Sequence, residues 1–83
     1  MTAQFDLLKQ MFLGNMILIN SQKYGLTKCM VEEMEERSIL STRGSSRSVI
    51  INGTAYDRDS FSIKGCKSIL YNDGMEVCTF EVL

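Results

Sequence analysis

The stretch SVIINGTAY, residues 48–56, decides how the second half of this 83-residue chain folds. Asn52 and Gly53 are flanked directly by β-branched residues, and this is the strongest short-range signal for a β-hairpin. Both central positions of a type I′ turn have positive φ, a conformation that Asn and Gly adopt readily. The stretch therefore predicts two antiparallel strands, over 48–51 and 54–56, joined by a two-residue turn.

More strands are expected around this hairpin. Residues 61–63 alternate apolar and polar side chains, as a half-buried strand does. Apolar runs over 68–71 and 75–82 flank the sequence Asn-Asp-Gly at 72–74, which predicts a second hairpin turn. Residues 39–40 are candidates for an additional edge strand.

The N-terminal part, over 1–37, is predicted to be mainly helical. Apolar side chains recur there at spacings of three and four residues, at Phe5, Leu8, Phe12, Met16 and Ile19. This spacing favours one helix over 3–22, although Gly14 within it costs about 1 kcal/mol. The alternative is a helix that ends at Leu13 and is followed by a strand over 16–19.

A second, shorter helix is predicted over 28–37. Thr27 is a suitable N-cap, and Met30, Val31 and Met34 supply an apolar face. The exposed face of this helix then carries four acidic side chains, those of Glu32, Glu33, Glu35 and Glu36.

These elements predict an α+β fold in a single small domain over 1–83, with the strands in 38–83. One or two N-terminal helices are expected to pack on a four- to five-stranded antiparallel β-meander. A small SH3-like or OB-like β-barrel with helices is the alternative arrangement of the same strands.

The residue types make an enzyme an unfavoured interpretation. The chain has no histidine, so the commonest general base and the commonest metal ligand are both absent. Asp57, Asp59 and Glu76 are carboxylates whose spacing supports neither a metal site nor a hydrolase pair. We therefore expect no catalytic residues, no metal and no cofactor.

The cysteines and the apolar segments bear on the compartment. Three cysteines without a CxxC motif favour free, partly buried thiols in a reducing, cytoplasmic compartment. A Cys66–Cys78 bridge between neighbouring strands is the alternative. The apolar run over 11–19 is far shorter than the roughly 20 residues that span a bilayer, so no membrane partner is expected.

Charge is segregated along the chain, although the net charge is only −1. Residues 1–36 carry three lysines and five acidic side chains, and residues 68–83 carry three acidic side chains alone. Residues 37–67 carry six basic side chains and two acidic ones. Segregation of this kind suits electrostatic docking on a protein surface.

The leading hypothesis is therefore a small non-enzymatic interaction module, an adaptor or inhibitor that docks on a larger protein. Small chains of this type are common in phages and mobile elements, which makes such an origin an expectation. The candidate partner-binding residues are the four glutamates of the second helix and two arginines of the polar segment 41–48, Arg43 and Arg47.

The alternative is a small β domain that binds nucleic acid or a nucleotide. Its basic side chains would contact phosphate and its aromatic rings would stack on bases, through Arg43, Arg47, Arg58, Lys64, Tyr56 and Phe61. A homodimer, in which methionine and aromatic side chains of two copies complete one core, is a third interpretation.

Overall fold

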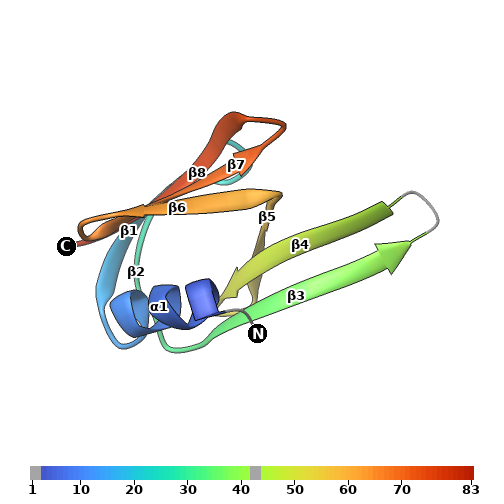
Figure 1. Cartoon of the computed structure of the whole chain (residues 1–83). Helices are drawn as coiled ribbons and strands as arrows, with labels where there is room; N and C mark the ends of the chain where they lie inside the picture. Colours follow the sequence, from blue (N-terminus) through green and yellow to red (C-terminus); the bar gives the residue numbers. More distant parts are fainter. Residues whose placement is uncertain (1–2, 42–43) are drawn as a thin grey trace.

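The computed structural model describes residues 3–41 and 44–83, which form one helix and eight strands (Figure 1). The elements are α1 (Ala3–Phe12), β1 (Met16–Ser21), β2 (Gly25–Met30), β3 (Met34–Ser41), β4 (Gly44–Ile51), β5 (Thr54–Arg58), β6 (Ser60–Lys64), β7 (Lys67–Asn72) and β8 (Met75–Val82). The α+β class is confirmed at this level, but the protein is mostly β and has more strands than predicted.

The strands form two antiparallel sheets. One has five strands in the order β2-β1-β8-β7-β6, and the other has three in the order β3-β4-β5. The chain passes from one sheet to the other at two corners, over residues 31–33 and at Asp59. Strands that change sheets at bends are typical of sheets packed at a steep angle. The SH3-like or OB-like barrel stays a prediction.

The predicted helix over 3–22 is wrong, and its alternative is close to the structure. The helix ends at Phe12, and Gly14 has a φ of 82°, which ends a helix readily. The Gly14 N–H donates to the Val31 carbonyl at 2.8 Å, and the Val31 N–H donates to the Asn15 carbonyl at 3.0 Å. These bonds to a distant segment replace the next helical turn, so the chain enters β1 instead.

The predicted helix over 28–37 is also wrong, because these residues belong to β2, the first corner and β3. Cys29 lies opposite Ile17 of β1, and Glu36 lies opposite Val49 of β4. The segment pairs with β1 before the corner and with β4 after it. This pairing outweighs helix propensity, because the propensities of ordinary residue types differ by less than about 0.7 kcal/mol per residue.

Both predicted hairpin turns are confirmed. Asn52 and Gly53 have φ values of 52° and 86°, and Asp73 and Gly74 have φ values of 53° and 76°. These positive values are those of a type I′ turn. The strand predicted over 61–63 lies within β6.

The Asn52 side chain also holds the first corner. Its Oδ1 accepts the backbone N–H groups of Glu32 at 2.9 Å and Glu33 at 3.0 Å. Its Nδ2 donates to the Met30 carbonyl at 2.8 Å. One residue therefore forms the β4–β5 turn and fixes the bend between β2 and β3.

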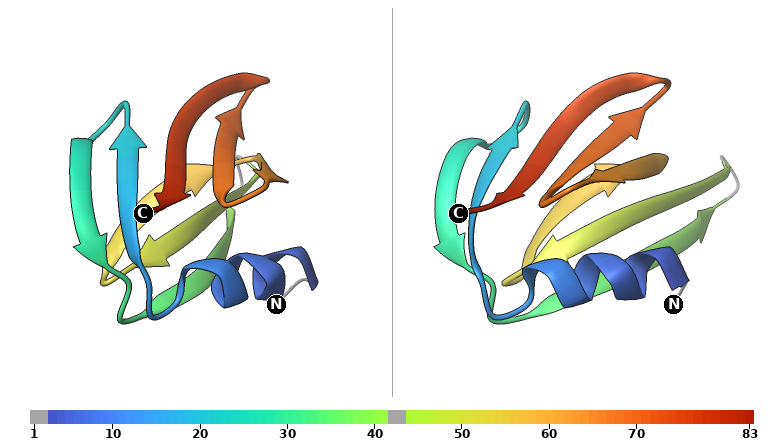
Figure 2. Two further views of the ribbon diagram at one scale, coloured as in Figure 1. Left: turned by 90° about the vertical axis from the view of Figure 1, so that its left-hand side faces the viewer. Right: turned by 60° about the vertical axis from the view of Figure 1, so that its left-hand side comes forward.

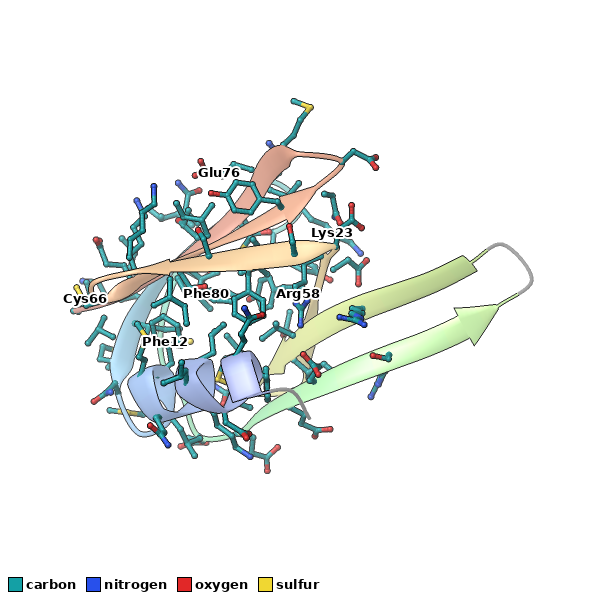
Figure 3. The ribbon with its side chains drawn as sticks, viewed as in Figure 1. Phe12, Lys23, Arg58, Cys66, Glu76 and Phe80 are labelled. Atoms are coloured by element: carbon teal, nitrogen blue, oxygen red, sulfur yellow. The ribbon has the colours of Figure 1, made fainter. Side chains whose placement is uncertain are left out.

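A single hydrophobic core lies between α1 and the two sheets (Figure 2). The fully buried face of α1 consists of Phe5, Leu8 and Phe12, which is the face that the spacing predicted. The Phe80 ring of β8 packs edge to face against the rings of Phe12 and Tyr56. The ring centres are 6.0 Å apart for Phe12 and 5.3 Å apart for Tyr56. Phe12 and Phe80 are seen in the interior in Figure 3.

The hairpin of β3 and β4 extends beyond the rest of its sheet (Figure 1). Pairing with β5 stops where Arg47 lies opposite Arg58, whereas β3 and β4 remain paired as far as Ser41 and Gly44. The strand predicted at 39–40 lies in this arm, and most of the polar segment 41–48 belongs to β4. We call residues 38–41 and 44–47 the β3–β4 arm.

Candidate functional site

The four glutamates predicted as partner-binding residues do not share a face. Glu32 and Glu33 lie in the first corner, and Glu35 and Glu36 are neighbours on β3. Consecutive side chains of a strand point to opposite faces. Glu35 is accordingly exposed, whereas the Glu36 side chain is 9% exposed and pairs with Arg58.

Arg58 of β5 is buried in the structure, although it was predicted to bind phosphate. Its Nη2 donates to Oε2 of Glu36 at 2.5 Å, and its guanidinium carbon lies 4.6 Å from the centre of the Phe61 ring. Burial lowers the pKa of Arg58, and the Glu36 carboxylate opposes that shift. Arg58 is therefore engaged both with Glu36 and with the Phe61 ring.

The other predicted site residues are dispersed. Tyr56 is only 7% exposed and belongs to the core. Arg47 is exposed at the base of the β3–β4 arm, and Lys64 is exposed at the far end of β6. Arg43 lies outside the described residues.

An apolar surface on the outward side of the five-stranded sheet was not predicted from the sequence. Met16 lies opposite Met30, and the Leu83 N–H donates to the Met16 carbonyl at 3.1 Å, so these three residues are neighbours. Leu18 and Leu26 continue the same face along β1 and β2. We call Met16, Leu18, Leu26, Met30 and Leu83 the outer patch.

Four members of the outer patch are well exposed, at 42% for Met16, 43% for Met30, 58% for Leu83 and 68% for Leu26. Leu18, which is half-buried, lies between Lys28 of β2 and Glu81 of β8. The helix lies on the inner side of the sheet, so no element in the described part of the chain covers the patch (Figure 2).

Strand β2 carries part of this patch and has a free edge. It is the terminal strand of the five-stranded sheet and pairs only with β1 among the described residues. Five of its six residues are exposed, and Cys29 is half-buried. Its outer N–H and C=O groups are therefore open to pairing with another strand.

A small cavity opens where the β1–β2 turn meets β5 and β8. It has a volume of about 180 Å³, and its walls include Ser21, Lys23, Tyr24, Tyr56, Asp57 and Val77. We call it the tyrosine cavity, because the Tyr24 and Tyr56 rings lie edge to face at 5.4 Å. Lys23 and Glu76 both lie at this side of the molecule, well away from Cys66 (Figure 3).

Local hydrogen bonds position the walls of the tyrosine cavity. The Ser21 Oγ accepts the N–H groups of Lys23 and Tyr24, both at 3.2 Å, and so shapes the turn that presents the Tyr24 ring. Ser48 Oγ donates to Oδ1 of Asp57 at 2.7 Å, which holds that carboxylate in place. Burial is the main cause that raises the pKa of Tyr56 to about 12, so its hydroxyl is protonated at neutral pH.

The thiols of Cys29 and Cys78 are poorly suited to nucleophilic chemistry. All three cysteines are free, and burial raises the pKa of Cys78 to about 12 and also raises that of Cys29. A thiol of raised pKa is a weak nucleophile. The Val82 N–H donates to the Cys66 carbonyl, so Cys66 lies four residues along β8 from Cys78 and a bridge between them does not form.

Two other features are absent from the described residues. No group of three or more His, Cys, Asp or Glu side chains is placed to hold a metal ion in the described ranges. The helix α1, the one helix in the described ranges, is not long and apolar enough to cross a membrane.

Comparison with known proteins adds no assignment. No protein-family model, no curated protein and no solved structure matches this chain. Two features of the molecule itself bear on its function, the outer patch and the free edge of β2.

Proposed function

We propose that this protein is a small non-enzymatic interaction module, an adaptor or inhibitor that docks on a larger protein through the outer patch and β2. The observation that carries the proposal is a strand exposed on both faces and along one edge, on a face that carries four well-exposed apolar side chains. A position of this kind leaves a strand with little stabilisation from its own domain. A partner that covers β2 supplies the missing burial.

The chemistry of the outer patch suits a protein surface. Its apolar side chains alternate with charged ones, because Lys28 lies between Leu26 and Met30 on the outward face of β2 and Glu81 lies opposite Leu18 on β8. Protein–protein interfaces commonly combine apolar and polar surface. Exposed apolar side chains that gather on one face beside polar ones commonly mark interaction sites.

The free edge of β2 supports the same function through its backbone. An extended partner segment can add a strand there, with main-chain hydrogen bonds for affinity and side-chain contacts for specificity. The three free cysteines fit the reducing, cytoplasmic setting that we expect for this complex. The exposed Glu32, Glu33, Glu35 and Arg47 are available to steer a charged partner toward the molecule.

The nucleic-acid alternative has less support. Tyr56 and Arg58 are buried, and Phe61 stacks with Arg58, so half of its six residues are unavailable to bases or phosphates. The homodimer hypothesis placed Met16 and Met30 on helices, yet both lie on strands. A second copy on the outer patch remains an outcome that the experiment distinguishes.

The test compares three forms of the protein, isolated gently from the lysate of its own host and measured by native mass spectrometry. The wild type is expected to retain a stoichiometric larger protein. The double variant Leu26→Lys/Met30→Lys should lose at least tenfold of that complex, because charge enters the outer patch. Met75→Lys is the matched control, since Met75 and Leu26 are both 68% exposed.

Other results would contradict the proposal. Equal retention of the partner by the double variant would exclude the outer patch as the docking surface. Co-purified nucleic acid without a protein partner would favour the alternative function, and a bare dimer would favour self-association. A bare monomer under all conditions would leave the exposed patch without an interaction role.

A further inference from the structure

The free edge of β2, the outermost strand in Figure 2, presents the backbone groups of alternate residues. The Val31 N–H donates to the Asn15 carbonyl at 3.0 Å, and the Val31 carbonyl accepts the Gly14 N–H at 2.8 Å, so Val31 bonds toward the β1 side. In an antiparallel pair, a residue that bonds to the neighbouring strand alternates with one whose groups point away from it. Three residues of β2 therefore direct their backbone groups to the free edge, namely Leu26, Lys28 and Met30.

Asn52 occupies one of these backbone groups and marks one end of the open edge. Its Nδ2 donates to the Met30 carbonyl at 2.8 Å, so this carbonyl points away from β1, as the alternation requires. No group in the described part of the chain bonds to the edge-facing groups of Leu26 and Lys28. Each of these two residues therefore offers one donor and one acceptor to an added strand.

The outward face of the sheet has an unbalanced charge at this edge. Lys67 of β7 lies opposite Glu81 of β8, and Glu81 lies opposite Leu18 of β1. Lys28 also has Leu18 opposite it, and no described strand lies on its other side. Lys28 is exposed and forms no ion pair within the described residues. Opposite charges on adjacent strands stabilise a sheet, so an acidic side chain on an added strand suits this position.

A second copy of β2 is a poor occupant of the edge. In antiparallel self-pairing, the register that sets Leu26 of one copy opposite Met30 of the other also sets the two Lys28 side chains opposite each other. Like charges directly opposite are destabilising, and lysine on an edge strand is a common obstacle to pairing between copies. A shift of two residues keeps the faces but sets Lys28 opposite an apolar side chain. The edge therefore favours a different chain.

We propose that β2 binds an extended segment of a protein partner whose outward side chains alternate apolar, acidic and apolar. The acidic side chain lies opposite Lys28. The apolar side chains lie opposite Leu26 and Met30, where they widen the outer patch by one strand. The backbone of the segment pairs with the open groups of Leu26 and Lys28. This inference rests on the proposed function, because the segment belongs to the docked protein.

The test is an NMR titration of the isolated, isotope-labelled protein with the blocked heptapeptide Thr-Val-Thr-Glu-Thr-Val-Thr. Its sequence reads the same in both directions, so the pattern fits β2 in either strand orientation. Two comparison peptides carry Gln or Lys in place of the central Glu. Saturable shifts of the Leu26 and Lys28 amide signals are expected. The Glu peptide should bind about threefold or more tighter than the Lys peptide, with the Gln peptide between them.

Amide hydrogen exchange shows whether the peptide pairs as a strand. The bound Glu peptide should slow exchange of the Leu26 and Lys28 N–H groups, which point to the free edge. Exchange at Thr27 should change less, because its N–H points to β1. Absence of saturable shifts, equal affinity of the three peptides, or unchanged exchange at Leu26 and Lys28 would overturn the inference.

A charge exchange sharpens the test. Lys28→Glu should reverse the order, so that the Lys peptide binds more tightly than the Glu peptide. Lys64→Glu is the matched control, because Lys64 is an exposed lysine on β6, the other terminal strand of the same sheet, and it should keep the wild-type order. An unchanged order in Lys28→Glu would contradict the inference. The titration needs no natural partner, so its failure leaves the host-lysate experiment on the outer patch unaffected, and the reverse also holds.

Discussion

The two corners at which the chain passes between its sheets are built in opposite ways. At residues 31–33 one neutral side chain, that of the exposed Asn52, makes three hydrogen bonds to backbone groups. At Asp59 the chain is held by a backbone bond to Tyr71 and by a buried charge pair between the preceding Arg58 and Glu36. Loss of an exposed neutral bond is cheap, whereas an unpaired buried charge is costly.

The largest effect is expected when the buried pair is broken. Glu36→Ala leaves the Arg58 guanidinium buried without a counter-ion, which should lower the free energy of unfolding by about 3–5 kcal/mol. Urea denaturation measures this loss in the free energy of unfolding. The matched control is the triple variant Glu32→Lys/Glu33→Lys/Glu35→Lys, whose exposed side chains should cost no more than about 0.5 kcal/mol each.

A double variant shows whether charge is the cause. Replacing both partners with apolar residues, Glu36→Leu with Arg58→Met, should recover most of the stability, because no charge is then left unpaired. If Glu36→Ala costs under about 1 kcal/mol, the pair does not hold the second corner, and the contrast between the corners disappears.

A smaller effect is expected at the first corner. Asn52→Gly keeps a residue that tolerates positive φ but removes three hydrogen bonds, which should cost about 2 kcal/mol. Asp73→Gly is the matched control, because Asp73 has a φ of 53° against 52° for Asn52 and its side chain holds no corner. Thermal or urea unfolding of the two variants measures the difference. Equal losses of stability in the two variants would mean that the turn conformation at Asn52 matters, and not the hydrogen bonds of its side chain.

The smallest effect concerns Tyr56, on the strand that leads into the second corner. Its folded pKa of about 12 lies above the ordinary value of 10.0, so the folded state holds this proton more tightly. The resulting stability is complete below pH 10 and is lost as the pH rises toward 12. Cys78 adds a similar loss that begins near pH 9.

The urea midpoint should therefore fall between pH 9 and pH 11. In Tyr56→Phe that fall should be shallower, because the Tyr56 proton no longer contributes and only the protons of Cys78 and Cys29 do. An identical alkaline slope in the wild type and the variant would show that Tyr56 does not titrate with the folding reaction.

Local signals in the sequence predicted the parts of the fold that local chemistry decides. The two turns follow from residue pairs that tolerate positive φ, and the buried face of α1 follows from its spacing. The segment 28–37 was mispredicted because glutamate and methionine suit a helix, while its strands depend on partners far along the chain. Gly14 was the signal that favoured the shorter helix.

Less of the candidate site could be predicted from the sequence. Arg58 and Glu36 are 22 residues apart, and nothing local indicates that they pair or that both are buried. The outer patch depends on the register that places Met16 beside Met30. Because side chains alternate along a strand, a shift of one residue would have reversed which of them face outward.

The β3–β4 arm has a consequence for how the length of this chain can vary. Beyond the Arg47–Arg58 pair, the arm's two strands are bonded to each other and to no third strand among the described residues. Two residues inserted in each strand lengthen the ribbon by one full side-chain repeat and leave the sheet below in register. We therefore expect the arm to accept insertions of two residues in each strand. Each such insertion lengthens the arm and leaves the hydrophobic core unchanged.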